Sequence, residues 1–141
     1  MQKSTRKLPP LGAHMSIAGG VDRAVDRARD AGCTALQIFL KNNNQWRGKA
    51  LDDRTVERYR AEVGKGDLGQ PIAHSSYLVN LASPKPAVLA KGMDNLLDDL
   101  RRSEALGVPG IVLHPGAHMG TGDDKAIRQI ARQIVRCDLL A

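Results

Sequence analysis

Four short aliphatic runs alternate with four helical patterns along the 141-residue chain, and this alternation restricts the possible folds more than any other feature. Each run has the length of a strand, and each is followed by apolar residues at helical spacing. The runs are apolar on both faces, which is typical of buried parallel strands joined by right-handed crossovers. The pattern therefore predicts an α/β fold, with strands at 12–16, 34–40, 71–75 and 110–114.

Each helical segment has a recognisable apolar face and recognisable ends. Asp52 and Asp53 are expected to cap the second helix, and Asp123 and Asp124 the fourth. The charges at 22–30 and 98–104 are expected to be solvated. The residues expected to face the core are Val21, Ala24, Val25 and Ala28, then Val56, Tyr59 and Val63, then Leu89, Met93, Leu96, Leu97 and Leu100, then Ile127, Ile130, Ala131, Ile134 and Val135, together with Cys33 and Cys137 as reduced, buried cysteines.

The number of units distinguishes between the possible α/β architectures. An open, doubly wound sheet that binds nucleotides finds no support, because the first turn lacks G-x-G-x-x-G and no phosphate-binding G-x-x-x-x-G-K-[ST] occurs. A TIM barrel has eight strand-helix units in about 250 residues. As a TIM barrel, four parallel (β/α) units would form only the N-terminal half, with a flexible basic tail at 1–10 and a partial barrel at 11–141, and an open doubly wound sheet is the alternative. Such a half-barrel has two open sheet edges, so self-association is expected.

Charge and hydropathy narrow the classes of partner. The chain has 21 Lys and Arg against 15 Asp and Glu, a formal net charge of +6, which permits a polyanionic partner. Its longest apolar stretches fall far short of the roughly 20 residues of a membrane span. No apolar segment follows the basic residues at the N-terminus, so a secretory signal is not expected. We expect a cytoplasmic protein without a membrane partner.

Histidines close or follow the predicted strands. His14 lies in the first, His74 ends the third, and His114 ends the fourth, with His118 in the loop beyond. The carboxyl ends of parallel strands form the ligand-binding rim of α/β folds, and imidazoles there can bind a metal. We expect His74 and His114 to be metal ligands. We expect His14 and His118 to be supporting or structural residues, and a hydrogen-bonded structural role is the alternative for each histidine.

The loop after the second strand mixes cations, amides and an aromatic ring. Lys41, Asn42, Asn44 and Gln45 precede Trp46, and further cations follow at Arg47 and Lys49. This mixture is typical of nucleic-acid surfaces, although an isolated tryptophan can also pack back onto its own domain.

Four ordered motifs carry a family resemblance. They are Gly12-Ala13-His14-Met15-Ser16 with Ala18-Gly19-Gly20, Lys41-Asn42 with Gln45-Trp46, His74-Ser75-Ser76-Tyr77-Leu78-Val79-Asn80-Leu81, and His114-Pro115-Gly116-Ala117-His118. Between residues 11 and 135 the chain resembles the bacterial endonuclease IV family of AP endonucleases. The resemblance implies a TIM barrel with three zinc ions that hydrolyses the phosphodiester bond 5′ to abasic sites in duplex DNA, as part of base excision repair.

The resemblance also assigns roles to individual residues. It implies that His74 and His114 are two ligands of one zinc ion, and that Tyr77, Leu78 and the loop 41–46 contact DNA. Asn44 stands where some members have arginine. The remaining ligands, including the carboxylates, come from later strands in that family, so we expect no catalytic residue within this chain and regard it as a truncated piece. A sugar isomerase or epimerase on a similar barrel and a non-catalytic DNA-binding half-barrel are the alternatives.

Overall fold

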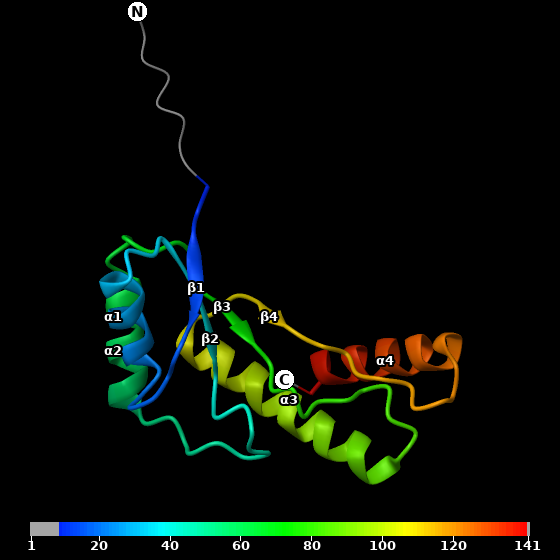
Figure 1. The fold of residues 1–141 in the computed structure, drawn as a ribbon. Coiled ribbons are helices and arrows are strands. Elements are labelled where there is room, and N and C mark those ends of the chain that lie inside the picture. Colours follow the sequence, from blue (N-terminus) through cyan, green and yellow to red (C-terminus); the bar gives the residue numbers. More distant parts are fainter. Residues whose placement is uncertain (1–8, 141) are drawn as a thin grey trace, which may run out of the picture.

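The structure is a computed structural model that describes residues 9–140, and it is built from four consecutive strand-helix units (Figure 1). The expected tail at 1–10 lies outside the described residues except for Pro9 and Pro10. The elements, in chain order, are β1 (Gly12–Met15), α1 (Asp22–Asp30), β2 (Ala35–Phe39), α2 (Asp53–Val63), β3 (Ile72–His74), α3 (Pro86–Leu106), β4 (Ile111–Val112) and α4 (Asp123–Asp138).

The four strands form one parallel sheet in the order of the sequence, β1-β2-β3-β4. Gly12 pairs with Ala35, Gln37 with Ile72, and Ala73 with Ile111. This arrangement confirms the predicted α/β fold of parallel units, and it is half of a TIM barrel. Because all strands run the same way, their carboxyl ends lie at one edge of the sheet. No helix between residues 9 and 140 is long and apolar enough to cross a membrane.

Helices cover one face of the sheet and leave the other open. Leu36, Ile38 and Ala73 point toward the helices and are fully buried. They join the buried face of α1 and Tyr59 of α2 in the main core. On the opposite face, which is the inner face of a barrel, Ile72 and Val112 remain 45% and 42% exposed. A second, smaller core lies between α3, α4 and the loop after β3.

The predicted helix ends are largely confirmed. Asp52 is the N-cap of α2, and its carboxylate accepts a hydrogen bond from the backbone N–H of Thr55 at 2.8 Å. Gly107 ends α3 in the left-handed conformation, with φ of 72°, which a residue with a side chain rarely adopts. At α4, however, Gly122 occupies the N-cap position. Asp123 and Asp124 lie in the first turn instead, where their charge favours the helix dipole.

The predicted inner face of α4 is wrong. Ile127, Ile134 and Val135 are exposed to 63%, 47% and 60%, and Ala131 is also exposed. Only Ile130 of the predicted set packs against the second core. The helix contacts α3 through the side that carries Ala126 and Cys137, so its broader apolar face has no partner among the described residues. In Figure 1, α4 lies at the β4 end of the molecule, farthest from α1 and α2.

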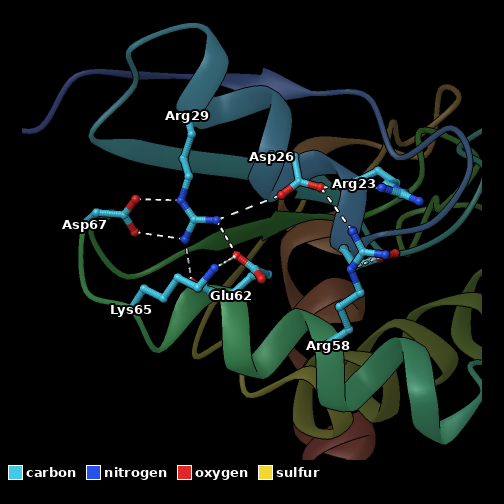
Figure 2. Close-up of polar contacts among 8 residues, drawn as sticks. Arg23, Asp26, Arg29, Arg58, Glu62, Lys65 and Asp67 are labelled. Carbon is cyan, nitrogen blue, oxygen red and sulfur yellow. Dashed lines mark hydrogen bonds and ion pairs between the residues drawn. The ribbon is translucent and has the colours of Figure 1, made fainter.

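The expectation that the helix charges are solvated is also wrong in part. Asp22 of α1 and both Asp99 and Arg102 of α3 are buried. Arg29 holds α1 against α2 and the turn that follows it, since its guanidinium pairs with Glu62 and Asp67 (Figure 2). The other polar residues drawn in that cluster include Arg23, Asp26, Arg58 and Lys65. Both cysteines are free, but Cys33 is only half-buried.

Candidate metal and nucleic-acid site

Aromatic rings from three strands and two loops gather at the carboxyl edge of the sheet. The ring centroid of His74 lies 5.0 Å from that of His114, 5.3 Å from that of Tyr77 and 6.0 Å from that of His14. Phe39 packs among them, 4.2 Å from His14. Three of the four histidines therefore share one small area, because parallel neighbours bring their strand ends together.

A hydrogen bond fixes the tautomer of His74. Its Nδ1 lies 2.7 Å from the carbonyl oxygen of Ser75, and because that oxygen only accepts, Nδ1 carries the proton. In the neutral ring the lone pair is then on Nε2. Metal-binding histidines characteristically donate their second ring nitrogen to a carbonyl in this way. Buried His74 thus has the protonation pattern of a ligand, and His114 beside it is exposed.

His14 lies at the margin of this group. Burial is the main cause that lowers the pKa of His14, and the nearby His74 lowers it further, while a hydrogen bond with Gln37 opposes the change. A lowered pKa keeps the imidazole neutral and able to donate or accept hydrogen bonds near neutral pH.

His118 is held in its own loop. Its Nδ1 accepts hydrogen bonds from the backbone N–H groups of Gly120 and Gly122, both at 3.2 Å. Nε2 lies 3.4 Å from a carboxylate oxygen of Asp123. These contacts use both ring nitrogens for the turn that leads into α4, and within residues 9–140 no ring contact joins His118 to the other histidines.

The loop after β2 presents its amides and its aromatic ring to solvent, but not its first cation. Asn42, Asn44 and Gln45 are exposed, and Trp46 is 37% exposed. The side chain of Lys41, in contrast, is only 2% exposed, and its ammonium pairs with Asp99 and Asp98 at 2.6 and 2.9 Å. In this conformation Lys41 has no surface to offer to DNA. Tyr77, from the next loop, is 60% exposed, and Leu78 beside it is half-buried.

Side chains that the sequence analysis did not assign connect the three loops. Ser76 donates from Oγ to the carbonyl oxygen of Asn43 at 2.7 Å, which joins the loops after β2 and β3. Asn80 joins the loops after β3 and β4, because its amide donates to and accepts from the backbone of Ala117, at 3.1 Å in each case. The available signal was the position of Ser76 and Asn80 within the His74–Leu81 motif, in which the sequence analysis gave roles only to His74, Tyr77 and Leu78.

The donor set at this edge offers two of the side chains that a metal site needs. His74 and His114 are two imidazole nitrogen donors whose ring centroids lie 5.0 Å apart. Among the residues that the structure describes, no third histidine, cysteine or carboxylate joins them in a group of metal-binding geometry. The two imidazoles fit a role as part of a zinc ligand set, and zinc sites commonly take four ligands.

Comparisons with known proteins place the chain in a family. The family model described as xylose isomerase-like TIM barrel, AP endonuclease 2, matches residues 25–141. The chain belongs to this AP endonuclease family of TIM barrels. Within the family it matches proteins named endonuclease 4, so the resemblance predicted from the four motifs is confirmed.

Two relatives and one solved structure show how far the match extends. The probable endonuclease 4 of Geobacter sp. (strain M21) is 42% identical over 85% of this chain and 42% of its own length. That of Chloroflexus aurantiacus (strain ATCC 29366 / DSM 635 / J-10-fl) is 37% identical over 95% and 46%. The crystal structure of endonuclease IV from Thermus thermophilus matches with a TM-score of 0.78 and 39% identity, covering 91% of this chain and 46% of that one. The chain thus spans less than half the length of these AP endonuclease family members.

The sugar-enzyme alternative rests on the fold alone. A D-psicose 3-epimerase from Clostridium cellulolyticum H10, solved with D-tagatose, matches with a TM-score of 0.54 at 16% identity. At that identity the likeness shows a shared barrel architecture and nothing about the substrate.

Proposed function

We propose that this AP endonuclease family chain contributes to a zinc-dependent hydrolase of DNA repair, which cleaves the phosphodiester bond 5′ to abasic sites in duplex DNA. The observation that carries the proposal is the pairing of His74 with His114 beside the exposed Tyr77. This arrangement places two nitrogen donors for a metal beside an aromatic surface that can contact a base or a sugar. The cytoplasmic location and the membrane-free surroundings expected from the sequence are part of the same proposal.

His74 and His114 are proposed as two ligands of one zinc ion, through Nε2 in the case of His74. A bound zinc ion would activate water and stabilise the charge that develops on the phosphate. The carbonyl oxygen of Ser75 holds the ring of His74 through Nδ1 and leaves Nε2 available. The bridging carboxylates that the reaction needs are proposed to come from outside this chain. The chain would then supply two of the ligands of the metal site.

The DNA surface is proposed to consist of Tyr77, Leu78 and the exposed part of the loop after β2, which includes Asn42, Asn44, Gln45 and Trp46. Amide side chains bind phosphates, and aromatic rings stack on bases that have lost a partner. Asn44 is uncharged, so it adds hydrogen bonds without the electrostatic attraction of an arginine. We leave Lys41 out of this surface because its ammonium is paired inside the protein.

Metal binding by purified chain tests the zinc assignment. Titration of Zn²⁺ into the wild-type chain, followed by calorimetry, is compared with His74→Ala, His114→Ala and His118→Ala. We expect either of the first two substitutions to weaken zinc binding at least about tenfold, as loss of one ligand implies. His118→Ala is expected to keep most of the affinity. Equal zinc affinity in all four proteins would refute the assignment.

Strand nicking of a duplex with one abasic site tests the reaction. We expect zinc-dependent binding of the duplex, weakened by Tyr77→Ala. Nicking by the chain that disappears in the His74→Ala/His114→Ala double variant would show that the missing ligands are supplied by another copy. A chain that binds abasic and intact duplexes equally, with or without zinc, would favour the non-catalytic DNA-binding alternative.

A further inference from the structure

A cluster of charges, buried except for the half-exposed Asp98, lies behind the loop that follows β2, at its contact with α3. Lys41 places its ammonium 2.6 Å from Asp99 and 2.9 Å from Asp98, and it also donates to the carbonyl oxygen of Asn95 at 3.0 Å. Arg102 pairs with Asp98 at 2.9 Å. Two positive and two negative groups balance one another here. Such a cluster costs desolvation energy and is weak evidence for stability, so another role has to be considered.

The cluster reaches the loop at several points along its backbone. Arg102 donates to the carbonyl oxygen of Lys49 at 2.8 Å, and Asn95 donates from its side chain to the carbonyl oxygen of Trp46 at 3.0 Å. The loop fits tightly on these groups. A Cβ atom at Gly48 would lie 2.8 Å from Cβ of Lys41 and 2.9 Å from a guanidinium nitrogen of Arg102.

The same cluster reaches the histidines through one carboxylate. The second oxygen of Asp99 accepts a hydrogen bond from Oγ of Ser75 at 3.0 Å, with both side chains buried. Ser75 in turn accepts the Nδ1 proton of His74 with its carbonyl oxygen. Asp99 is therefore bonded on one side to Lys41, which directly precedes the loop 42–49, and on the other to Ser75, whose carbonyl oxygen sets the tautomer of His74.

The carboxylate of Asp98 is stabilised in its charged form by Lys41 and Arg102. Burial opposes its ionisation, but hydrogen bonds from Lys41 and Arg102 prevail and hold the pKa of Asp98 below its ordinary value. The carboxylate stays charged at neutral pH, as the paired cations require.

We infer that Lys41, Asp98, Asp99 and Arg102 are positioning residues, which set the shape of the loop 42–49 and the orientation of His74 together. The importance of the loop for DNA rests on the proposed function, whereas the positioning itself can be measured on the protein alone. Lys41 thus acts through the loop that it anchors. The conformation of the loop and the orientation of His74 both depend on the carboxylate of Asp99.

Trp46 offers a direct reading of the loop, because it is the one tryptophan of the chain. Acrylamide quenching of its fluorescence is measured well below the melting temperature in the 141-residue chain, as wild type, Asp99→Asn and Asn95→Ala. Glu104→Gln is the matched control, because it removes a negative charge from an exposed position of α3. We expect the quenching constant to rise about twofold in Asp99→Asn and in Asn95→Ala, as for a released loop, and to stay at the wild-type value in the control.

Ser75→Ala separates the histidine side of the cluster from the loop side. We expect it to shift the ring nitrogen signals of His74 in NMR spectra while Trp46 quenching stays near the wild-type value. Asp99→Asn is expected to change both the ring nitrogen signals of His74 and the quenching of Trp46. A structural role alone would lower the melting temperature and leave these two measurements unchanged. Unchanged quenching in Asn95→Ala and Asp99→Asn would overturn the inference, and if Asp99→Asn fails to fold, Asn95→Ala and Ser75→Ala decide it.

Binding of an abasic duplex by the same variants links the cluster to the proposed function. We expect Asp99→Asn to bind about tenfold more weakly than Glu104→Gln. If the wild-type chain binds no DNA, the proposed function fails while the quenching and NMR results still decide the positioning role.

Discussion

At the scale of single residues, one glycine sets how closely the first two strands approach. A Cβ atom at Gly12 would lie 1.9 Å from the carbonyl oxygen of Ala35, its partner in the sheet. No rotation of a side chain relieves such a contact, because the neighbouring atom belongs to the backbone. The strands have to move apart if any other residue occupies this position.

We therefore predict that Gly12→Ala lowers the free energy of unfolding by about 1–3 kcal/mol, the range for overpacked sites. Chemical denaturation of the purified chain measures it. Gly110→Ala is the control, because a Cβ atom there meets nothing within 4 Å. Equal stability of the two variants would show that β1 and β2 tolerate a wider spacing.

The roles of residues could be predicted from sequence only where a short motif carried them. His74 and His114 stood out because each ends an aliphatic run, and their rings do lie together, although zinc binding itself stays a prediction. The pairing of Lys41 with Asp99 could not be foreseen, since 58 residues separate them. A faint signal existed, because Asn95, Asp99 and Arg102 recur at helical spacing beside the apolar stripe of α3.

At the scale of elements, the periodicity of apolar residues predicted where the helices form. It did not predict which elements each helix packs against. The apolar faces of α1, α2 and α3 were predicted correctly because each packs on a neighbour within the described residues. The pattern of α4 identified an apolar face but not what covers it. Strand β4 is shorter than the predicted run, because only Ile111 and Val112 of that run pair with β3. Periodicity reports amphipathicity, and packing depends on which surfaces are present.

The ion pairs of Arg29 in Figure 2 make the stability of the contact between α1 and α2 depend on pH. The hydrogen bonds from Arg29 lower the pKa of Asp67 from 3.8 to about 2. A lowered pKa stabilises the folded chain at pH values above 3.8, and this contribution is lost as the pH falls through about 2. The effect is modest because Asp67 is exposed to solvent.

We accordingly predict that Asp67→Asn lowers the melting temperature at neutral pH and that the difference from wild type disappears near pH 2. Thermal melts over a pH series measure this. Asp30→Asn changes an exposed carboxylate of α1 that has no ion pair within residues 9–140, and it is expected to match the wild type throughout. A difference for Asp67→Asn that persists to the lowest pH would contradict the Arg29 pairing.

At the scale of the whole molecule, a strand edge that is unpaired among the described residues and an apolar helix face lie together at the β4 end. The outer edge of β4 is unpaired within residues 9–140, the inner face of the sheet is open, and α4 exposes its broad apolar face. Unpaired strand edges and contiguous apolar patches both promote association.

We predict that the purified chain self-associates through this end. Sedimentation velocity over a concentration series is expected to show dimers or larger species. Substitution of Ile127 and Ile134 by Ser is expected to reduce association, whereas Leu11→Ser, a similarly exposed residue before β1, leaves it unchanged. A monodisperse monomer that melts cooperatively would contradict the prediction.

The spatial order of the strands equals their order in the chain, and this has a consequence for biosynthesis. Each strand after the first pairs with the strand immediately preceding it. A nascent chain leaving the ribosome therefore has the docking partner of every new strand already in place, and the sheet can grow by one unit at a time. Assembly does not have to wait for a distant segment, because each new strand docks on the edge left by the strand before it.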